Sequence, residues 1–393
     1  MAAPLVVWDR RMLGYDLGGH HPLHPLRWDL TWALASEFGV LDAYDVLAPQ
    51  PADDRTLGWV HTAGYIAAVR AASSSVPMSV GHGLGTDDNP IFPGMHDNAA
   101  LIAGGSVDAA RAIAHGEVDR AVNFCGGLHH AMPDHASGFC VYNDAALGIH
   151  ALLEAGVRRV AYIDVDAHHG DGVQAAFYDD PRVLTISLHE SPMTLFPGTG
   201  WPTELGVGAA QGTAVNVALP AGTGDAAWLR AFHAVAPGLI RAFRPEVLVT
   251  QQGADGHRED PLADLMLTVD GQRTTYLALR ELAREVTGGR WLALGGGGYS
   301  PVRVVPRAWT HLLAIVADRD LAPTTPMPPE WCARAAAARS DVELPIDMSD
   351  GEPGTIAHRP WAGHLQMPVD RAILQTREAV YPLHGLDPRD PRD

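Results

Sequence analysis

The chain has few cysteines and no long apolar run. Its three cysteines, Cys125, Cys140 and Cys332, are too few among 393 residues to form a disulfide framework. No stretch approaches the roughly 18 uninterrupted apolar residues that a membrane-spanning helix needs. The N-terminal residues lack the basic and apolar regions of a signal peptide. These absences predict a soluble cytoplasmic protein without a membrane partner.

Basic side chains are also scarce. The chain has 28 Lys plus Arg against 46 Asp plus Glu, a formal net charge of -18. Nucleic acids and anionic membranes are bound through basic patches, so we expect neither as a direct partner. The acidic excess favours attraction of cationic groups. The hydrophobic content of 47% is sufficient for a substantial core.

Short β-branched apolar runs alternate with stretches of helical periodicity. The expected strands are 121–124, 160–165, 183–188, 247–250 and 291–294. The expected helices are 98–115, 144–155, 226–243, 272–286 and 302–316. This alternation predicts an α/β fold with a mainly parallel sheet covered on both faces. Within these helices, Gly104 and Gly105 weaken the first, and Pro237 is expected to kink or divide the third.

The composition of the chain changes near residue 320, after which several prolines lie close together. We expect one large domain over residues 1–320 and a C-terminal extension over 321–393, made of a proline-rich linker and a tail. The pattern leaves three roles for the extension open: packing on the core, acting as a lid, or contacting a second subunit.

Polar clusters follow the expected strands. Ligands of parallel α/β sheets bind at the carboxyl ends of the strands, so several such clusters predict one shared site. The residues that follow the five strands are, in chain order, His129 and His130, then Asp166, His168 and Asp171, then His189, then Asp255 and His257, then Gly295 to Tyr299.

Asp166, His168 and Asp255 form a candidate metal site. A single Asp-x-His pattern is more often a solvated loop, but here the density of ionisable groups at strand ends reverses that expectation. Buried charges must be paired or bound to metal, and a mixture of carboxylate and imidazole suits zinc. Three protein ligands leave a position open for water or substrate, as in catalytic zinc sites.

Other polar residues near these ligands suggest acid–base chemistry. His129 and His130 are candidate bases, and Gly126–Gly127 would permit the turn that brings both rings to one site. Asp164 and Asp171 are candidate partners that fix the histidine tautomers. The Tyr299 hydroxyl follows four glycines and is a candidate donor to a developing oxyanion.

Taken together, these motifs resemble the histone deacetylase superfamily, and within it the class I-like bacterial acetoin-utilisation-type deacetylases. The likeness covers roughly residues 15 to 317. Besides the groups above, it rests on four further motifs, His20-His21-Pro22-Leu23, Ala103 to Ser106, Gly138 to Asp144 and Phe196 to Gly200. The resemblance implies the arginase/deacetylase-like three-layer α/β/α fold, with residues 1–320 as the catalytic domain.

The resemblance also implies roles for individual residues. It makes Asp166, His168 and Asp255 zinc ligands, with Fe²⁺ as an alternative ion in the cell. His129 and His130 become the acid–base pair, backed by Asp164 and Asp171 respectively, and Tyr299 polarises the carbonyl. The implied substrate-binding residues are Pro22, Asp88 (or Asp87), Gly138, Phe139, Phe196 and Leu262. A structural K⁺ is implied at Asp164, Asp166, His168, Ser187 and Leu188, largely through backbone oxygens.

These features predict a zinc-dependent amidohydrolase that removes acetyl or other acyl groups from the Nε-amine of lysine in proteins and releases acetate. An acyl-CoA synthetase is one protein substrate that the resemblance suggests. Three alternatives stay open: an acetylpolyamine amidohydrolase or another small-molecule N-acetyl amidohydrolase, an arginase-like ureohydrolase, and a catalytically silent acyl-ligand sensor. The substrate, acyl-chain preference and formation of a homo-oligomer are also left open.

Overall fold

The computed structural model describes residues 2–74, 81–319, 321–351 and 354–393. Its strands form one parallel sheet of order β2-β1-β3-β8-β7-β4-β5-β6. The strands are β1 Leu5–Val7, β2 Asp45–Leu47, β3 Arg120–Asn123, β4 Val160–Asp164, β5 Val183–Glu190, β6 Ala214–Leu219, β7 Val247–Gln251 and β8 Trp291–Leu294. The α-helices are α1 Leu26–Glu37, α2 Asp54–Leu57, α3 Ala63–Ser73, α4 Met95–Ala114, α5 Asp144–Glu154, α6 Asp171–Ala176, α7 Asp225–Phe243, α8 Val269–Thr287, α9 Val305–Val316, α10 Pro329–Ala338 and α11 Asp370–Val380.

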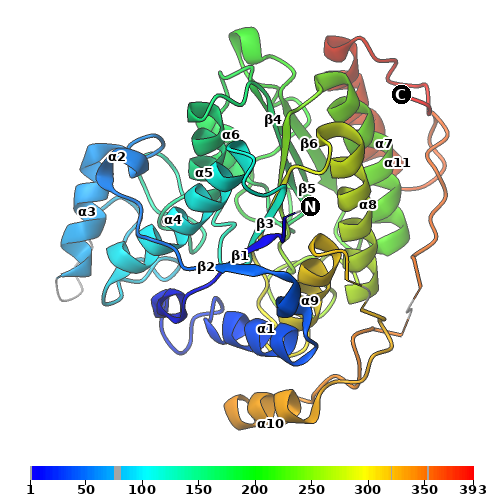
Figure 1. The fold of residues 1–393 in the computed structure, drawn as a ribbon. Helices are drawn as coiled ribbons and strands as arrows, with labels where there is room; N and C mark the ends of the chain where they lie inside the picture. The colour runs from blue at the N-terminus through cyan, green and yellow to red at the C-terminus, as the bar shows by residue number, and fades with distance from the viewer. Residues whose placement is uncertain (1, 75–80, 320, 352–353) are drawn as a thin grey trace.

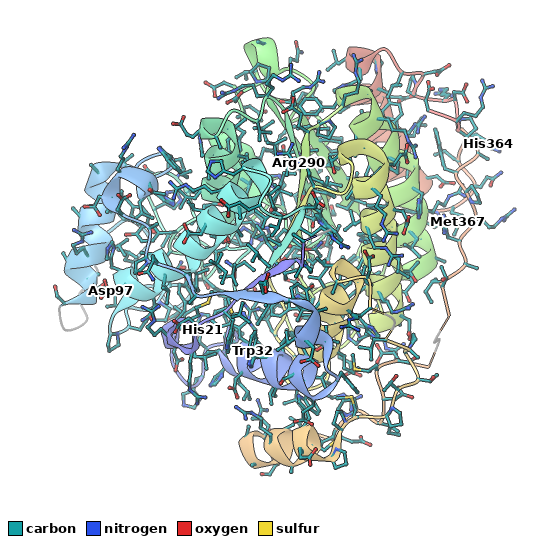
Figure 2. All side chains as sticks on the ribbon, viewed as in Figure 1. His21, Trp32, Asp97, Arg290, His364 and Met367 are labelled. Atoms are coloured by element: carbon teal, nitrogen blue, oxygen red, sulfur yellow. The ribbon has the colours of Figure 1, made fainter. Side chains whose placement is uncertain are left out.

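Helices cover both faces of the sheet (Figure 1). The long helix α4 and the shorter α5 pack on one face, and α7, α8 and α9 pack on the other. Side chains fill the space between the sheet and both helical layers (Figure 2). The predicted three-layer α/β/α architecture is therefore confirmed.

The central strands end level with one another, and this positions the site. Every residue of β4, β5, β7 and β8 is buried, as expected for apolar strands covered on both faces. Asp164, the last residue of β4, pairs in register with Gln251 of β7 and with Ser187 of β5. Gln251 in turn pairs with Leu294, the last residue of β8. The loops that follow β4, β7 and β8 therefore leave from one edge of the sheet.

The five strands expected from the sequence are present, and the structure adds β1, β2 and β6. The sequence pattern missed β1 and β2 because each has only three residues. Pro237 does not divide its helix, contrary to one of the two expected outcomes, because α7 runs unbroken from Asp225 to Phe243. Pro237 is among the buried residues of α7, so tertiary packing outweighs the loss of one N–H donor.

One further expectation needs correction. His189 does not follow a strand but lies within β5, which continues to Glu190. Gly104 and Gly105 lie within α4, and a Cβ atom at Gly104 would lie 1.8 Å from the carbonyl oxygen of Gln50. Glycine at this position allows the segment after β2 to approach the helix closely.

Residues after 320 pack against two sides of the molecule. The indole Nε1–H of Trp331 in α10 donates to the carbonyl of Leu30 in α1 at 2.9 Å. On the other side, the extension passes through His364 and Met367 and reaches α11 (Figures 1 and 2). There Asp370 forms a buried ion pair with Arg230 of α7, with 2.6 Å between Oδ1 and Nε. A division of the chain at residue 320 stays a prediction.

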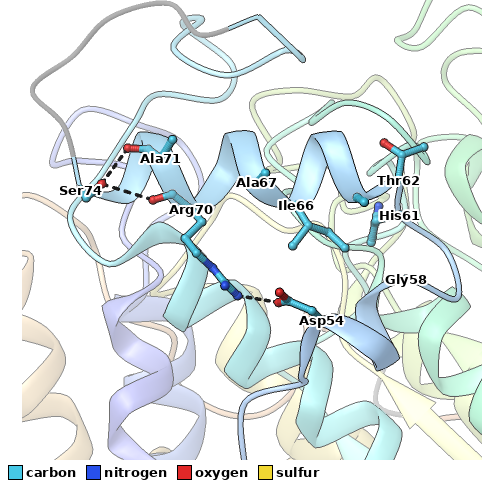
Figure 3. A pocket seen from close by; sticks show the side chains of 10 residues that line it. Asp54, Gly58, His61, Thr62, Ile66, Ala67, Arg70, Ala71 and Ser74 are labelled. Atoms are coloured by element: carbon cyan, nitrogen blue, oxygen red, sulfur yellow. Dashed lines mark hydrogen bonds and ion pairs between the residues drawn. The ribbon is translucent and has the colours of Figure 1, made fainter.

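A surface groove of about 680 Å³ lies between α2 and α3 (Figure 3). The Arg70–Asp54 ion pair crosses it, and none of the residues predicted for the site lines it. Among the described residues, no helix has the length and apolarity to span a membrane.

Candidate active site

Asp166, His168 and Asp255 converge at the carboxyl edge of the sheet. The Nδ1 atom of His168 lies 3.1 Å from Oδ1 of Asp166 and 3.0 Å from Oδ2 of Asp255. The three side chains are buried, and one ligand atom from each lies within 4.8 Å of the others. Because β4 ends at Asp164, Asp166 and His168 belong to the loop after the strand rather than to its last residues. The donor set can hold a metal ion.

Two glycines allow this convergence. A Cβ atom at Gly253 would lie 2.0 Å from Oδ2 of Asp166, and one at Gly297 would lie 1.9 Å from Oδ2 of Asp255. No other residue type fits these positions unless the carboxylates move. The N–H of Gly297 also donates to Oδ2 of Asp166 at 2.8 Å. The loops after β7 and β8 therefore shape the carboxylate cluster as well as enclosing it.

The electrostatics of the cluster favour a bound cation. Burial lowers the pKa of His168, but hydrogen bonds and charge from Asp166 and Asp255 outweigh it and raise that pKa well above its ordinary value. Burial and the charge of Asp166 raise the pKa of Asp255 to about 6. Two neighbouring buried carboxylates thus attract one positive charge, which a proton or a metal ion can supply.

His129 and His130 lie beside this cluster, each on its own carboxylate. Nδ1 of His129 lies 2.7 Å from Asp164, and Nδ1 of His130 lies 2.7 Å from Asp171. The two Nε2 atoms are 3.1 Å apart. The turn expected at Gly126–Gly127 is present, with a φ of 87° at Gly127. Both rings therefore turn their Nε2 atoms toward one another.

The two histidines hold protons with different affinity. Burial lowers the pKa of His129, but the charges of Asp164 and Asp166 outweigh it and raise the pKa to about 9. Burial and the neighbouring charge of His129 lower the pKa of His130 to about 4. The opposite directions of the two shifts make one ring the better proton donor and the other the better acceptor, as an acid–base pair requires.

Tyr299 is half-buried and follows the glycines after β8. Burial and the charges of Asp255 and Asp166 raise the pKa of its phenol well above the ordinary value, so the hydroxyl is a hydrogen-bond donor at neutral pH. Its ring meets the Phe139 ring edge-on, with 5.6 Å between centroids. Its backbone N–H donates to Oδ2 of Asp260 at 2.8 Å.

Phe196 and Gly138 lie against the His130 ring. Phe196 is 44% exposed, and its ring lies edge-on to His130 at 5.1 Å between centroids. A Cβ atom at Gly138 would lie 2.4 Å from the His130 ring. Leu262 is partly buried on the loop after Asp255, and its N–H donates to Oδ1 of Asp260.

The remaining predicted substrate-binding residues lie near Phe139. The His21 ring packs edge-on against Phe139 at 4.5 Å, and its Nε2 atom lies 3.2 Å from the backbone oxygen of Asp88. Asp87 and Asp88 are both exposed. Pro22 is partly buried and follows His21 directly.

The residues expected around K⁺ lie on neighbouring strands. Asp164 of β4 and Ser187 of β5 are register partners, and Leu188 follows in β5. The Ser187 hydroxyl lies 2.8 Å from Nδ1 of His189. The N–H of Asp166 donates to Oδ1 of Asp164 at 3.2 Å, which places this group beside the metal-ligand cluster.

Several residues at the site were not identified from the sequence. Arg27 of α1 is buried and donates to the carbonyls of Gly296 and Gly298, which hold the loop before Tyr299. The Tyr162 hydroxyl donates to Asp164 at 2.6 Å, and the Gln251 amide donates to Asp166 at 2.7 Å. Of these three, Gln251 carried a signal as a polar residue at the end of a buried strand, and Tyr162 as a polar residue within one.

With this geometry in place, comparison with known proteins identifies the family. A model described as "Histone deacetylase domain" matches residues 21–316. The chain belongs to the histone deacetylase family. Acetoin utilization protein AcuC of Bacillus subtilis (strain 168) is 41% identical over 339 residues, covering 86% of this chain and 87% of that protein. The AcuC of Staphylococcus xylosus is 36% identical over 332 residues, covering 84% and 86% respectively.

Membership of the histone deacetylase family and similarity to the AcuC proteins make this chain a hydrolytic deacetylase. The same findings bear out the resemblance drawn from the motifs. They do not distinguish a lysine side chain in a protein from a small acetylated amine as the substrate.

Proposed function

We propose that this deacetylase removes acetyl groups from the Nε-amine of lysine in proteins and releases acetate. The observation that carries the proposal is the pair His129 and His130, each held by its own carboxylate, beside the three-ligand cluster. A ureohydrolase would leave this pair and Tyr299 without a role. A silent sensor would not need an acid–base pair at all.

Asp166, His168 and Asp255 would hold zinc, since two carboxylates and one imidazole suit this ion. The same donors accept Fe²⁺, which we keep as the alternative. When bound, the metal would polarise the acyl carbonyl and make water more acidic. Asp164, Asp166, His168, Ser187 and Leu188 would hold a structural K⁺ next to it.

The histidine pair moves the protons of the reaction. A neutral imidazole takes the proton of the attacking water, and a protonated imidazole gives one to the leaving amine. Asp164 and Asp171 accept from the two Nδ1 atoms, so the Nε2 atoms are the ones that face the reaction. The Tyr299 hydroxyl donates to the oxygen on which negative charge develops.

Gly138, Phe139, Phe196 and Leu262 would line the approach for a slender, extended acyl-lysine. Apolar walls bind the methylene chain of the substrate, and polar groups at the rim orient the peptide backbone. Asp88, with Asp87 as the alternative, would accept from the backbone of the substrate. Pro22 would border the rim beside His21.

The loop after His257 carries three acids, Glu259, Asp260 and Asp264, which would attract a polyamine if their charges were uncompensated. In the structure, Glu259 is paired with Arg303 at 2.6 Å, and Asp260 is buried with both oxygens accepting from the backbone. Glu259 and Asp264 are both exposed, but the charge of Glu259 is offset by Arg303. The loop therefore presents little uncompensated negative charge to a polycation, which favours the lysine substrate.

The test compares kcat/KM of the zinc-loaded protein on an acetyl-lysine peptide and on N-acetylated polyamines. The chain contains no lysine, so every acetyl-lysine signal comes from the substrate. A preference for the peptide supports the proposal, and a preference for the polyamine overturns it.

Tyr299→Phe tests the mechanism in the same assay. We expect kcat to fall by roughly 100-fold or more, as when one oxyanion donor is removed, with the metal content unchanged. Tyr44→Phe is the control, because that phenol donates to the carbonyl of Leu313 in α9. Near-normal turnover by Tyr299→Phe would contradict the assigned role.

A further inference from the structure

The C-terminal extension contributes Asp350 to a buried ionic cluster behind the site. Oδ2 of Asp350 accepts from Nε2 of His257 at 2.6 Å, and Oδ1 accepts from Nη2 of Arg307 at 2.8 Å. The side chains of Asp350, His257 and Arg307 are 5%, 0% and 1% exposed. The cluster joins the extension, the loop after β7 and helix α9.

Asp350 itself is held firmly in place. Its N–H and the hydroxyl of Ser349 both donate to Oδ2 of Asp270, at 2.8 and 2.9 Å. The N–H of Val269 donates to Oδ2 of Asp350 at 2.9 Å. Arg307 also donates to the carbonyl of Ser349 at 2.7 Å. The first turn of α8 and helix α9 therefore hold the Asp350 carboxylate in one orientation.

His257 connects Asp350 to the loop after β7, which carries the candidate metal ligand Asp255. Its Nδ1 accepts from the N–H of Glu259 at 3.0 Å, so its proton is on Nε2, the atom that donates to Asp350. His257 follows the candidate metal ligand Asp255 by two residues. It precedes Asp260, which accepts from the N–H groups of Tyr299 and Leu262.

A second contact ties the same loop to the extension. Arg303 forms a bidentate ion pair with Glu259, at 2.6 and 3.1 Å, and donates to the carbonyl of Glu343 at 2.9 Å. Arg303 and Glu259 are both about one-third exposed, so this contact contributes less than the buried one.

We propose that Asp350 is a positioning residue of the active site. Its bond to His257 positions the loop after β7. This loop carries Asp255 at one end and, at the other, Asp260, which accepts from the N–H of Tyr299. The roles of Asp255 and Tyr299 in this inference rest on the proposed function. Removing a residue that orients metal ligands without touching the metal typically lowers metal affinity or activity by about 10- to 100-fold.

Asp370 provides a matched control within the same extension. It is a buried aspartate that pairs with a buried arginine, Arg230, and accepts from the N–H groups of Gln366 and Met367. Its partners lie on α7 and in the extension and do not include the loop after β7. Loss of either aspartate charge weakens the anchoring of the extension, but only Asp350 bonds to the active-site loop.

The experiment compares full-length Asp350→Asn, Asp370→Asn and the parent protein. For each, the Kd for Zn²⁺ of the metal-free protein is measured against a chromophoric chelator, together with kcat, KM and the urea midpoint. We expect Asp350→Asn to raise the Kd about tenfold and to lower kcat, whereas Asp370→Asn changes only the urea midpoint. Equal Kd and kcat for the two variants would overturn the proposal.

If Asp350→Asn does not fold, His257→Gln decides by the same readouts, because it leaves the Asp350–Arg307 ion pair in place. A parent protein without turnover on any acetylated amine would count against the proposed function. The Zn²⁺ affinities would still decide the role of Asp350, so the two failures are distinguishable.

Discussion

His129 and His130 illustrate how neighbouring side chains acquire different chemistry. Adjacent residues in an extended chain point apart, but the turn at Gly127 brings the two Nε2 atoms to 3.1 Å. At that separation two positive rings repel, so the rings hold protons at different pH. Burial and the charge of His129 lower the pKa of His130 to about 4, whereas the charges of Asp164 and Asp166 outweigh burial and raise the pKa of His129 to about 9.

Asp260 is a residue whose importance its sequence position concealed. In the sequence it stands among the charged residues Arg258 and Glu259, but it is buried and accepts from the backbone of Tyr299 and Leu262. Burial and the charge of Asp255 raise its pKa to about 8. Sequence reasoning missed this role because the charged residues around it resemble a surface loop.

Asp260→Ala should lower kcat on an acetyl-lysine peptide roughly tenfold, about 1.4 kcal/mol, because two backbone N–H groups lose their acceptor and the Tyr299 hydroxyl shifts. Asp260→Asn retains one acceptor oxygen, so its kcat should lie between those of Asp260→Ala and the parent. The measurement is steady-state kinetics with the metal content of each variant determined in parallel. Parent-like kcat in Asp260→Ala would show that Tyr299 does not depend on this contact.

At the scale of elements, the site depends on strands β4, β7 and β8 ending level with one another. Asp164, Gln251 and Leu294 share one register across the three strands. The loops that follow must then cross within a few ångströms, which requires glycine where backbone meets carboxylate. Gly297 is the sharpest case, since a side chain there would collide with Asp255.

Gly297→Ala should therefore weaken metal binding by displacing Asp255. We expect the Kd for Zn²⁺ to rise about tenfold or more, comparable to the loss of a ligand-orienting contact, as measured by chelator competition. Gly64→Ala in α3 is the control, since its Cβ would meet no atom within 4 Å. Unchanged Zn²⁺ affinity in Gly297→Ala would mean that the two loops move apart without affecting the ligand.

At the scale of the whole molecule, buried arginines attach the extension to the core. Arg230 and Arg307 pair with Asp370 and Asp350, and Arg377 donates to the carbonyls of Ala234, Asp387 and Pro388. Burial alone would raise the pKa of Asp370, but the hydrogen bond from Arg230 and two backbone N–H groups outweigh it and lower the pKa.

The stability lost in Asp370→Asn should depend on pH. A carboxyl whose folded pKa is lowered stabilises the fold fully above its unfolded pKa of about 3.9, and this contribution is lost as pH falls below that value. We expect Asp370→Asn to cost roughly 3 kcal/mol at about pH 7, because it leaves Arg230 buried without its charged partner. The difference should shrink at about pH 3.5. Urea unfolding at both pH values checks this, and a difference independent of pH would contradict it.

The fold class and the chemical groups gathered at the carboxyl edge of the sheet can be predicted from the amino-acid sequence. Apolar strands alternating with helices required a covered parallel sheet, and polar residues after Val165, Thr250 and Leu294 had to meet at its carboxyl edge. These are local patterns whose period and position can be read along the chain.

Only the tertiary structure decided which distant residues support that site. The contacts of Asp350 with His257, and of Arg27 with the loop before Tyr299, join residues 93 and about 270 positions apart. No local pattern encodes such pairs, because their energy comes from burial and hydrogen bonding that exist only once the chain is folded. Tertiary packing also outweighs local preference in the short strands β1 and β2 and in the helix that continues through Pro237.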